Sequence, residues 1–388
     1  MAMTSPGSRR SPRAHHEARV LDVLRVHGSA SRAQLAASTG LSRATISAIT
    51  SDLRQSGLII RSNSVAAHPG VGRTPERLTL NPGSCVIVGV EFSHTRVTVA
   101  VSDVTHRILG SKAREHGRDE PWVRRLGTAT AFIDSLVAAP SEPIAIGLGV
   151  PGAITGRETV MTGLEQQLGE KYGVPIRMEN NARLAGLAEF SWGAGREMTD
   201  LIYLRLSEGV GGVLIVDGEP RLGTTGSAGE LGHVCINPDG PICRCSNRGC
   251  LEAYVGLGAL LATAGASSVP ELIEALDRAE PGAQAAITEA GSHIGLVLAN
   301  TCRILDLSSI VLGGPLAQVG EHLVRVVKQT IMRHVHSTAA ERLQIRAAEL
   351  GNLDGALGGV ALVLRDRTIP VGTRPLPAHA RRTADAAI

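Results

Sequence analysis

Residues 18–60 carry a helical pattern of apolar positions that glycine interrupts. A first group has the i, i+3, i+4 spacing of one helical face: Val20, Val23 and Leu24. Ser31 and Gln34 fit a capping box, so a second helix is expected to begin there. Gly40 ends that pattern, and Ser42 can cap a third helix that stops near Gly57. The buried stripe of the third helix is Ile46, Ile49 and Leu53. Two helices joined by a short glycine-containing turn predict a helix-turn-helix.

Residues 58–80 continue this segment with two β-prone runs around a tip rich in Gly, Pro and Ser. This pattern predicts a hairpin, the wing of a winged helix-turn-helix. Arg73 lies near the tip of that hairpin.

The pattern changes after residue 82, where strand-like and helix-like stretches alternate. We expect strands at 85–92, 96–104, 107–112, 144–150, 200–207, 211–218, 308–314 and 343–350. We expect helices at 121–138, 283–306, 319–334 and 355–365, and one more directly after the asparagines at 180 and 181, which Asn181 could cap. Two groups of closely spaced strands, each followed by helices and further strands, predict two related α/β lobes with a cleft between them.

Composition fits this organisation. The chain has 388 residues, of which 43% are hydrophobic, so there is room for roughly two or three domains. No run approaches the roughly 18 consecutive apolar residues of a membrane span, and the basic N-terminus has no apolar stretch after it. We expect a cytoplasmic protein that does not enter a membrane. The domains expected are a disordered basic tail at 1–14, a winged helix with its linker at 15–82, a two-lobed ligand-binding domain at 83–367 and a disordered tail at 368–388.

Charge is unevenly spread along the chain. Residues 1–80 hold 11 Arg, no Lys and 4 acidic residues, a net charge of +7, so the rest carries −4. A basic first fifth indicates that this segment meets a polyanion. Guanidinium and hydroxyl groups suit phosphates and base edges, and an arginine on the wing suits a minor groove. The residues expected to contact double-stranded DNA are Arg32, Ser42, Arg43, Thr45, Ser47 and Arg73. The alternative is a three-helix packing module that binds no DNA.

Three of the six cysteines fall within eight residues, at Cys243, Cys245 and Cys250, and His233 precedes them by ten positions. Three thiolates and one imidazole make a closed tetrahedral set that suits structural zinc. A cytosolic location argues against disulfides. The alternative is a set of reduced cysteines without a metal.

These stretches together resemble the ROK family of repressors, uncharacterised frames and sugar kinases. The resemblance covers residues 18–366, and it rests on GELGHV at 229–234, CRCSNRGCLE at 243–252, VPG at 150–152, ENN at 179–181 and the winged helix. It implies an actin-like, hexokinase-type (RNase H-like) fold of two lobes, a structural zinc, a sugar site in the cleft, and homodimers or homotetramers. Members with an N-terminal winged helix are transcriptional regulators, mostly repressors of carbohydrate genes.

The departures from the family kinases concern the catalytic motifs. Their D-x-G-x-T phosphate loop is replaced by EFSHT at 91–95, and their G-T-G-x-G loop by SEGVG at 207–211. Their E-N-D motif ends in the aspartate that serves as general base, whereas Asn181 stands at that position here. An amide cannot take a proton at neutral pH. We therefore expect a disabled kinase site with no catalytic residue.

The resemblance also implies a ligand site. It maps the sugar contacts onto Asn180, Glu230, His233 and Glu252, with Asn181 beside them. Alternatively, Glu230 and Glu252 only support the zinc loop. The stretch from Pro151 to Asn180 is also too short for the loop that usually closes over the sugar.

We therefore expect a repressor that binds a double-stranded DNA operator and senses a carbohydrate. The ligand would shift the lobes and change the spacing of two winged helices in a dimer. A ligand-independent DNA-binding regulator with a vestigial cleft is the first alternative. An ATP-dependent sugar kinase with an extra N-terminal domain is the second.

Overall fold

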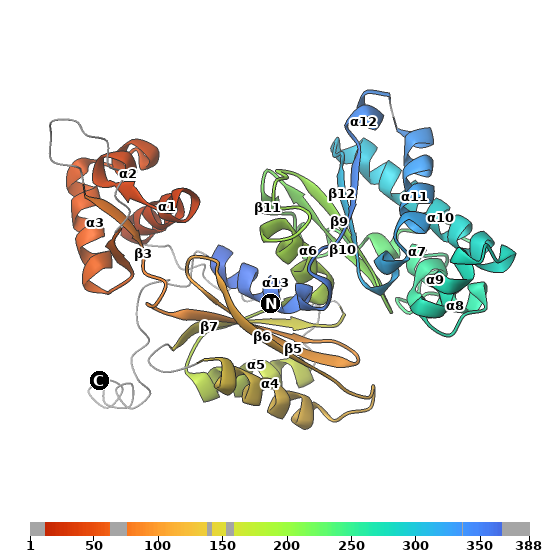
Figure 1. The fold of residues 1–388 in the computed structure, drawn as a ribbon, viewed down its shortest axis with the longest axis horizontal. Coiled ribbons are helices and arrows are strands. Elements are labelled where there is room, and N and C mark those ends of the chain that lie inside the picture. Colours follow the sequence, from red (N-terminus) through yellow and green to blue (C-terminus); the bar gives the residue numbers. More distant parts are fainter. Residues whose placement is uncertain (1–11, 63–75, 138–141, 153–158, 336, 367–388) are drawn as a thin grey trace, which may run out of the picture.

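The computed structural model describes residues 12–62, 76–137, 142–152, 159–335 and 337–366. A small N-terminal winged helix sits beside a two-lobed α/β body (Figure 1). The expected fold class is confirmed. The two expected disordered tails lie outside the described residues, except for residues 12–14, where the expectation is wrong because they form the start of the first helix.

The winged helix has the elements that its capping residues predict. Its helices are α1 (Pro12–His27), α2 (Arg32–Thr39) and α3 (Arg43–Gln55), and its strands are β1 (Ala30–Ser31), β2 (Ile59–Arg61) and β3 (Arg77–Leu80). The capping box of α2 is confirmed, because Gln34 N donates to Ser31 Oγ at 3.3 Å and Ser31 N donates to Gln34 Oε1 at 2.9 Å. β2 and β3 pair antiparallel as the two sides of the wing. The tip of the wing, with Arg73, lies outside the described residues.

Lobe 1 is a five-stranded sheet with two helices on one face (Figure 1). Its strands are β4 (Val86–Phe92), β5 (Arg96–Asp103), β6 (Ile108–Glu115), β7 (Pro143–Val150) and β8 (Ile176–Asn180), in the order β6-β5-β4-β7-β8. Apolar side chains of α4 (Trp122–Leu136) and α5 (Thr159–Tyr172) pack against β4, β5 and β7. The sequence pattern indicated α4 but not α5.

Lobe 2 repeats the strand order of lobe 1. Its strands are β9 (Leu201–Leu206), β10 (Val210–Val216), β11 (Glu219–Pro220), β12 (Ser309–Gly313) and β13 (Gln344–Ala347), in the order β11-β10-β9-β12-β13. In both sheets three antiparallel strands are followed by two parallel ones. The helices of this lobe are α7 (Leu251–Val255), α8 (Leu257–Ala264), α9 (Val269–Asp277), α10 (Pro281–Leu305), α11 (Glu321–His334) and α12 (Ser337–Arg342). The expectation of two related lobes is confirmed.

Two helices lie between the two sheets, and each packs against one of the lobes. α6 (Asn181–Ser191) packs on lobe 2, where a Cβ on Gly186 would meet Val213 and Tyr203. α13 (Asp354–Arg365) packs on lobe 1, where a Cβ on Gly147 would overlap the Gly359 carbonyl. Both helices are buried along most of their length.

The winged helix shares an apolar core with lobe 1, and we call this contact the joint. Leu58 and Leu80 of the winged helix belong to one buried cluster with Cys85, Ile144 and Val363 of the body. Arg25 of α1 lies close by, and its burial lowers the pKa of the guanidinium.

The segment Leu257–Asp277 is apolar enough, with a mean hydropathy of 1.2 over its best window, to be tested as a membrane span. The residues form two helices, α8 and α9, separated by a turn at Gly265. Leu260 and Leu272 of these helices pack into the core of lobe 2. The segment thus contributes side chains to the lobe 2 core, and 28% of its most apolar window is buried.

Candidate functional site: a winged helix, an interlobe cleft and a cysteine-rich loop

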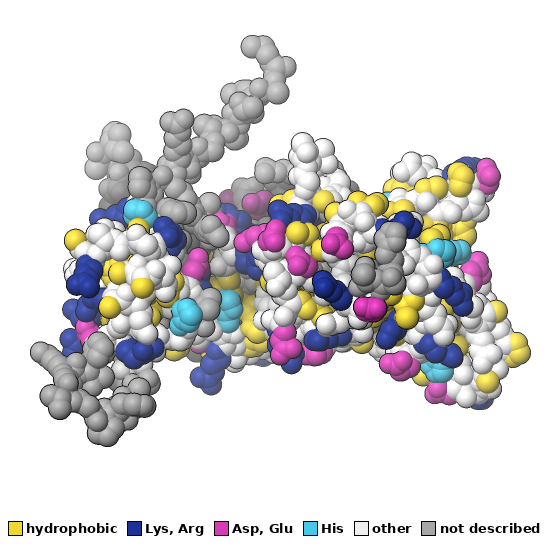
Figure 2. Space-filling view, turned by 90° about the horizontal axis from the view of Figure 1, so that it is seen from above, with side chains coloured by type: hydrophobic (Ala, Val, Ile, Leu, Met, Phe, Trp, Pro, Cys, Tyr) yellow, Lys and Arg dark blue, Asp and Glu magenta, His cyan; other side chains and the backbone are white. Residues whose placement is uncertain are grey.

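The start of α3 presents an exposed polar surface. Arg43 and Ser47 are exposed and Thr45 is half-buried. Ser42 caps the helix, because Thr45 N donates to Ser42 Oγ at 3.1 Å. Figure 2 shows several basic and few acidic side chains over the winged-helix end of the molecule. This is the surface that a helix-turn-helix offers to a major groove.

Arg32 is held by its own domain. Its guanidinium donates to Thr50 Oγ1 at 3.1 Å and to Glu76 at 2.7 Å. Glu76 also pairs with Arg54 and Arg61. Arg32 therefore links α2 to α3 and to the base of the wing. Its expected contact with DNA stays a prediction.

A cleft of about 990 Å³ separates the lobes. Its lining includes the turn after β4, the start of α6, the turn after β9 and the start of α13. Four of the five residues expected to hold a ligand are part of this lining: Asn180, Asn181, Glu230 and His233. The structure therefore brings these four together.

The fifth expected ligand residue, Glu252, is buried behind the cysteine-rich loop. It accepts a hydrogen bond from Val210 N at 2.8 Å and pairs with Arg244 at 2.6 Å. Cys243 Sγ lies 3.8 Å from its Oε1. These contacts match the alternative in which Glu252 supports the loop.

The two asparagines at the start of α6 have different partners. Asn180 caps the helix, because its Oδ1 accepts from Ala182 N at 2.7 Å, and its amide donates to Gly152 O at 2.6 Å. The expectation that Asn181 caps this helix is therefore wrong, because Asn180 is the N-cap residue. Asn181 Nδ2 donates to Phe92 O at 2.8 Å, and its Oδ1 has no hydrogen-bond partner among the described residues.

Arg205 occupies the floor of the cleft and was missed by the sequence analysis. Both of its terminal nitrogens donate to Glu91 Oε1 at 3.0 Å, and one also donates to Asp354 Oδ1 at 3.3 Å. Glu91 is 1% exposed and Asp354 is 2% exposed. Burial raises the pKa of Glu91, and Arg205 opposes that rise. Burial opposes the charge of Arg205, but Asp354 and Glu91 outweigh it and raise the pKa of the guanidinium.

Each carboxylate that lines the described cleft forms an ion pair with an arginine, and three arginines serve all five. The ion pairs are Glu91 and Asp354 with Arg205, Glu179 and Glu230 with Arg183, and Glu208 with Arg118. The Arg118–Glu208 pair joins the lobes at the rim of the cleft, at 2.6 Å. A charged residue inside an apolar stretch, such as Arg205 in LIYLRL, signals a buried partner. That signal was present in the sequence.

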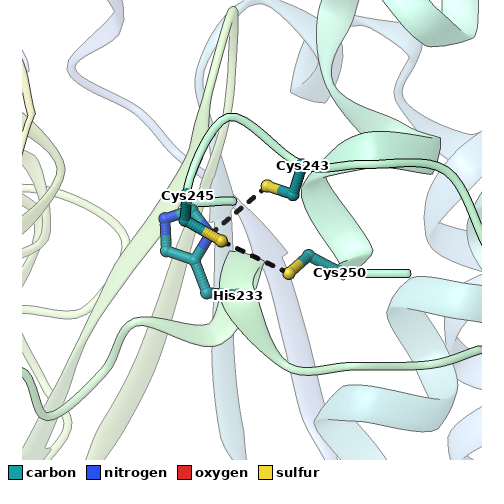
Figure 3. Close-up of side chains that lie close together, drawn as sticks. All are labelled: His233, Cys243, Cys245 and Cys250. Atoms are coloured by element: carbon teal, nitrogen blue, oxygen red, sulfur yellow. Dashed lines mark hydrogen bonds between the residues drawn. The ribbon is translucent and has the colours of Figure 1, made fainter. Parts of the chain in front are cut away.

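His233, Cys243, Cys245 and Cys250 converge around one point (Figure 3). Their ligand atoms all lie within 4.8 Å of one another. Cys243 Sγ is 3.7 Å from His233 Nδ1, and Cys245 Sγ is 3.6 Å from Cys250 Sγ. Bonds of the usual length from one zinc ion place tetrahedral ligands about 3.5–3.8 Å apart. The four residues therefore fit a single metal ion.

Comparison with known proteins places these features in context. A model of the ROK family matches residues 87–366, and a model of winged helix-turn-helix DNA-binding domains matches residues 15–60. The xylose repressor of Bacillus subtilis is 25% identical over 350 residues, which cover 86% of this chain and 91% of that protein. The glucokinase of Halalkalibacterium halodurans is 30% identical over 253 residues, 58% of this chain and 77% of the enzyme.

Among solved structures, a ROK family transcriptional regulator superposes with a TM-score of 0.78. The match covers 92% of this chain and 98% of the other, at 20% identity, and shows a shared fold from the winged helix to the second lobe.

Proposed function

The chain belongs to the ROK family, and from that membership we propose that it is a transcriptional repressor of carbohydrate-related genes. It binds a double-stranded DNA operator through its winged helix and senses a sugar or sugar derivative in the interlobe cleft. The observation that carries the proposal is the winged helix joined through a shared core to a body with a large interlobe cleft. The xylose repressor, which is similar over most of both chains, supports it.

The start of α3 supports DNA binding. Arg43 and Ser47 are exposed on the helix that a winged helix inserts into the major groove. Arg43 suits a guanine edge or a phosphate, and Thr45 and Ser47 suit base edges or phosphates. Ser42 would act by fixing the start of this helix.

The cleft lining supports a carbohydrate effector. Glu230, Asn181 and His233 line the cleft and offer a carboxylate, an amide and an imidazole. Such groups suit the hydroxyls of a sugar, because a buried amide oxygen or carboxylate needs donors. Asn180 would hold the start of α6 in place.

The same lining supports a protein that is not an enzyme. Asn181 stands where the family kinases have their base, and the ion pairs of Arg205 occupy Glu91 and Asp354. A carboxylate that is already paired with a guanidinium is a poor base. Because a glucokinase is among the relatives, ADP release with a panel of sugars is the assay that would revive the kinase alternative.

We assign structural zinc to His233, Cys243, Cys245 and Cys250. Bound zinc would fix the loop of residues 243–250 against the cleft, since His233 also lines it. A homodimer or homotetramer would bring two winged helices to two half-sites. The protein acts in the cytoplasm.

The test measures binding of the purified protein to DNA fragments upstream of its own and neighbouring genes, with and without a sugar library. We expect one sugar class to release the DNA. Glu230→Gln is expected to bind the DNA like the parent protein but to lose that release. The matched control is Glu274→Gln, a change at an exposed side chain of α9, which keeps the sugar response.

One observation favours a second candidate. Each carboxylate that lines the described cleft already has an arginine partner, so these side chains have ion-pair partners without a ligand. Tight DNA binding that no sugar changes would identify a ligand-independent regulator. Absence of DNA binding at every fragment would remove both candidates.

A further inference from the structure

Arg205 reaches from lobe 2 to the starts of both helices that lie between the lobes. Besides pairing with Glu91 of β4, it donates to the carbonyl oxygen of Asn181, the first residue of α6, at 3.2 Å. It also pairs with Asp354, the first residue of α13, at 3.3 Å. One planar guanidinium therefore holds β4, α6 and α13 together at the floor of the cleft.

The opposite ends of the same two helices reach the joint. Val360, Val363 and Leu364 of α13 belong to the apolar cluster that includes Leu58 and Leu80 of the winged helix. The rise of a helix places Leu364 about 15 Å from Asp354. α13 thus runs from the cleft to the DNA-binding domain.

α6 ends at the same place. Its C-capping residue Trp192 packs against the cluster of the joint. Trp192 Nε1 donates to His106 O at 3.0 Å, and the two rings lie 5.8 Å apart. Both interlobe helices therefore connect the cleft to the winged helix.

α13 is packed tightly against both α6 and β4. A Cβ on Gly358 would overlap the Leu184 carbonyl of α6, and a Cβ on Gly355 would overlap the carboxylate of Glu91. Closely packed interiors have low compressibility, so a shift at one end of such a helix is carried to the other.

We propose that Arg205 is the positioning residue through which the state of the cleft reaches the DNA-binding domain. This inference rests on the proposed function, because it assumes that a ligand in the cleft changes DNA binding. Arg205, Asn181 and Asp354 all line the cleft. A ligand that forms a hydrogen bond or an ion pair with any of these three residues changes how Arg205 divides its hydrogen bonds between α6 and α13. The two helices then change their relative position, and the joint changes with them.

The test uses Trp192 as a fluorescent reporter, because it packs against the joint. The chain has one other tryptophan, Trp122. In a Trp122→Phe background, Trp192 becomes the sole tryptophan. Arg205→Lys keeps the charge but loses the fork that holds two helices. Arg205→Met with Glu91→Gln removes the guanidinium together with one of its two carboxylates, which limits the buried charge left unpaired. We expect acrylamide quenching of Trp192 to rise by about twofold in both as the joint loosens.

The matched control is Arg118→Gln, which breaks a different lobe-to-lobe ion pair, the one with Glu208 at the rim of the cleft. That arginine is 57% exposed, so quenching of Trp192 is expected to stay at the parent value. The proposal is overturned if Arg205→Lys, folded by far-UV circular dichroism, leaves the emission and quenching of Trp192 unchanged. It is also overturned if Arg118→Gln changes them equally. Neither DNA nor sugar enters this measurement, so its outcome is independent of whether the proposed function holds.

Discussion

The side-chain oxygen of Asn180 accepts a hydrogen bond from Ala182 N, whereas that of Asn181 is buried and has no hydrogen-bond partner among the described residues. Two adjacent residues of one type therefore have different roles, because only the first sits at the N-cap of α6. The sequence shows that an amide replaces the base of the family kinases. It does not show which amide caps the helix, since either spacing is compatible with a cap.

The cysteine-rich loop gives a prediction about metal content. The purified protein is expected to carry one zinc ion per chain, and Cys245→Ser is expected to lose most of it, because three ligands hold the ion less tightly than four. Elemental analysis measures the content. Thermal melting is expected to fall with the loss of the metal. Cys235→Ser is the matched control, because Cys235 is exposed and lies outside the four-residue set. Zinc that is retained in Cys245→Ser at the parent stoichiometry would contradict the assignment.

His106 gives a prediction about pH. Burial lowers its pKa to about 4, Arg25 and Arg365 add to that effect, and Asp103 opposes it. The unfolded imidazole titrates near pH 6.5, so between these values the unfolded state binds more protons and stability falls as the pH falls. The loss is expected to reach as much as about 3 kcal/mol.

Urea unfolding between pH 7 and pH 4.5 measures this loss. His106→Asn removes the imidazole and keeps a residue that tolerates the positive φ of 69°. The variant is expected to lose less stability over the same range. An equal loss in the variant and the parent would assign the pH dependence to other groups.

At the scale of elements, the glycines of α13 give the sharpest prediction. Gly358→Ala would push a Cβ into the Leu184 carbonyl, so we expect a loss of about 1–3 kcal/mol or more in the free energy of unfolding. Chemical denaturation measures it. Gly127→Ala in α4 is the matched control, because nothing lies within 4 Å of its added Cβ. That change is expected to stabilise by up to about 1 kcal/mol. A Gly358→Ala protein as stable as the parent would show that the contact between α6 and α13 can relax.

Most elements could be predicted from the spacing of apolar residues. The capping box at Ser31, the meanders and the long helix α10 all appear where the pattern places them. The helices α5, α7, α8, α9 and α12 were missed. α5 has glycine inside it at Gly163 and Gly169, and α8 and α9 are short helices separated by Gly265. Glycine and shortness both weaken a periodic pattern.

The cleft was less predictable than the strands around it. Glu230 and His233 were placed in the cleft by resemblance, and the structure brings them there. The ion pairs of Arg205, by contrast, join residues more than a hundred positions apart, namely Glu91 and Asp354. No local spacing encodes such a pairing, and only the burial of a charged residue hints at it.

At the scale of the whole molecule, the basic winged helix on a mildly acidic body gives a prediction about salt. Residues 1–80 carry +7 and the rest −4, so DNA affinity is expected to fall by about a thousandfold between roughly 50 and 200 mM salt. Arg43→Gln is expected to reduce the slope of log affinity against log salt by about 1 if it contacts a phosphate. Fluorescence anisotropy across a salt series measures both. Arg221→Gln is the matched control, since this arginine is exposed on lobe 2. Salt-independent binding would argue against contacts to the phosphate backbone.

The ion pairs on the floor of the cleft also bear on how this chain can evolve. Glu91 and Asp354 are buried and the Arg205 side chain is only 11% exposed, and removing one partner of a buried pair costs about 3–5 kcal/mol. Domains are stable by only about 5–15 kcal/mol, so few single changes here leave a viable protein. Descendants of this chain are therefore expected to keep all three residues or to replace them together. In an alignment of close relatives, the three positions should covary, and the ancestral chemistry should be hard to regain one mutation at a time.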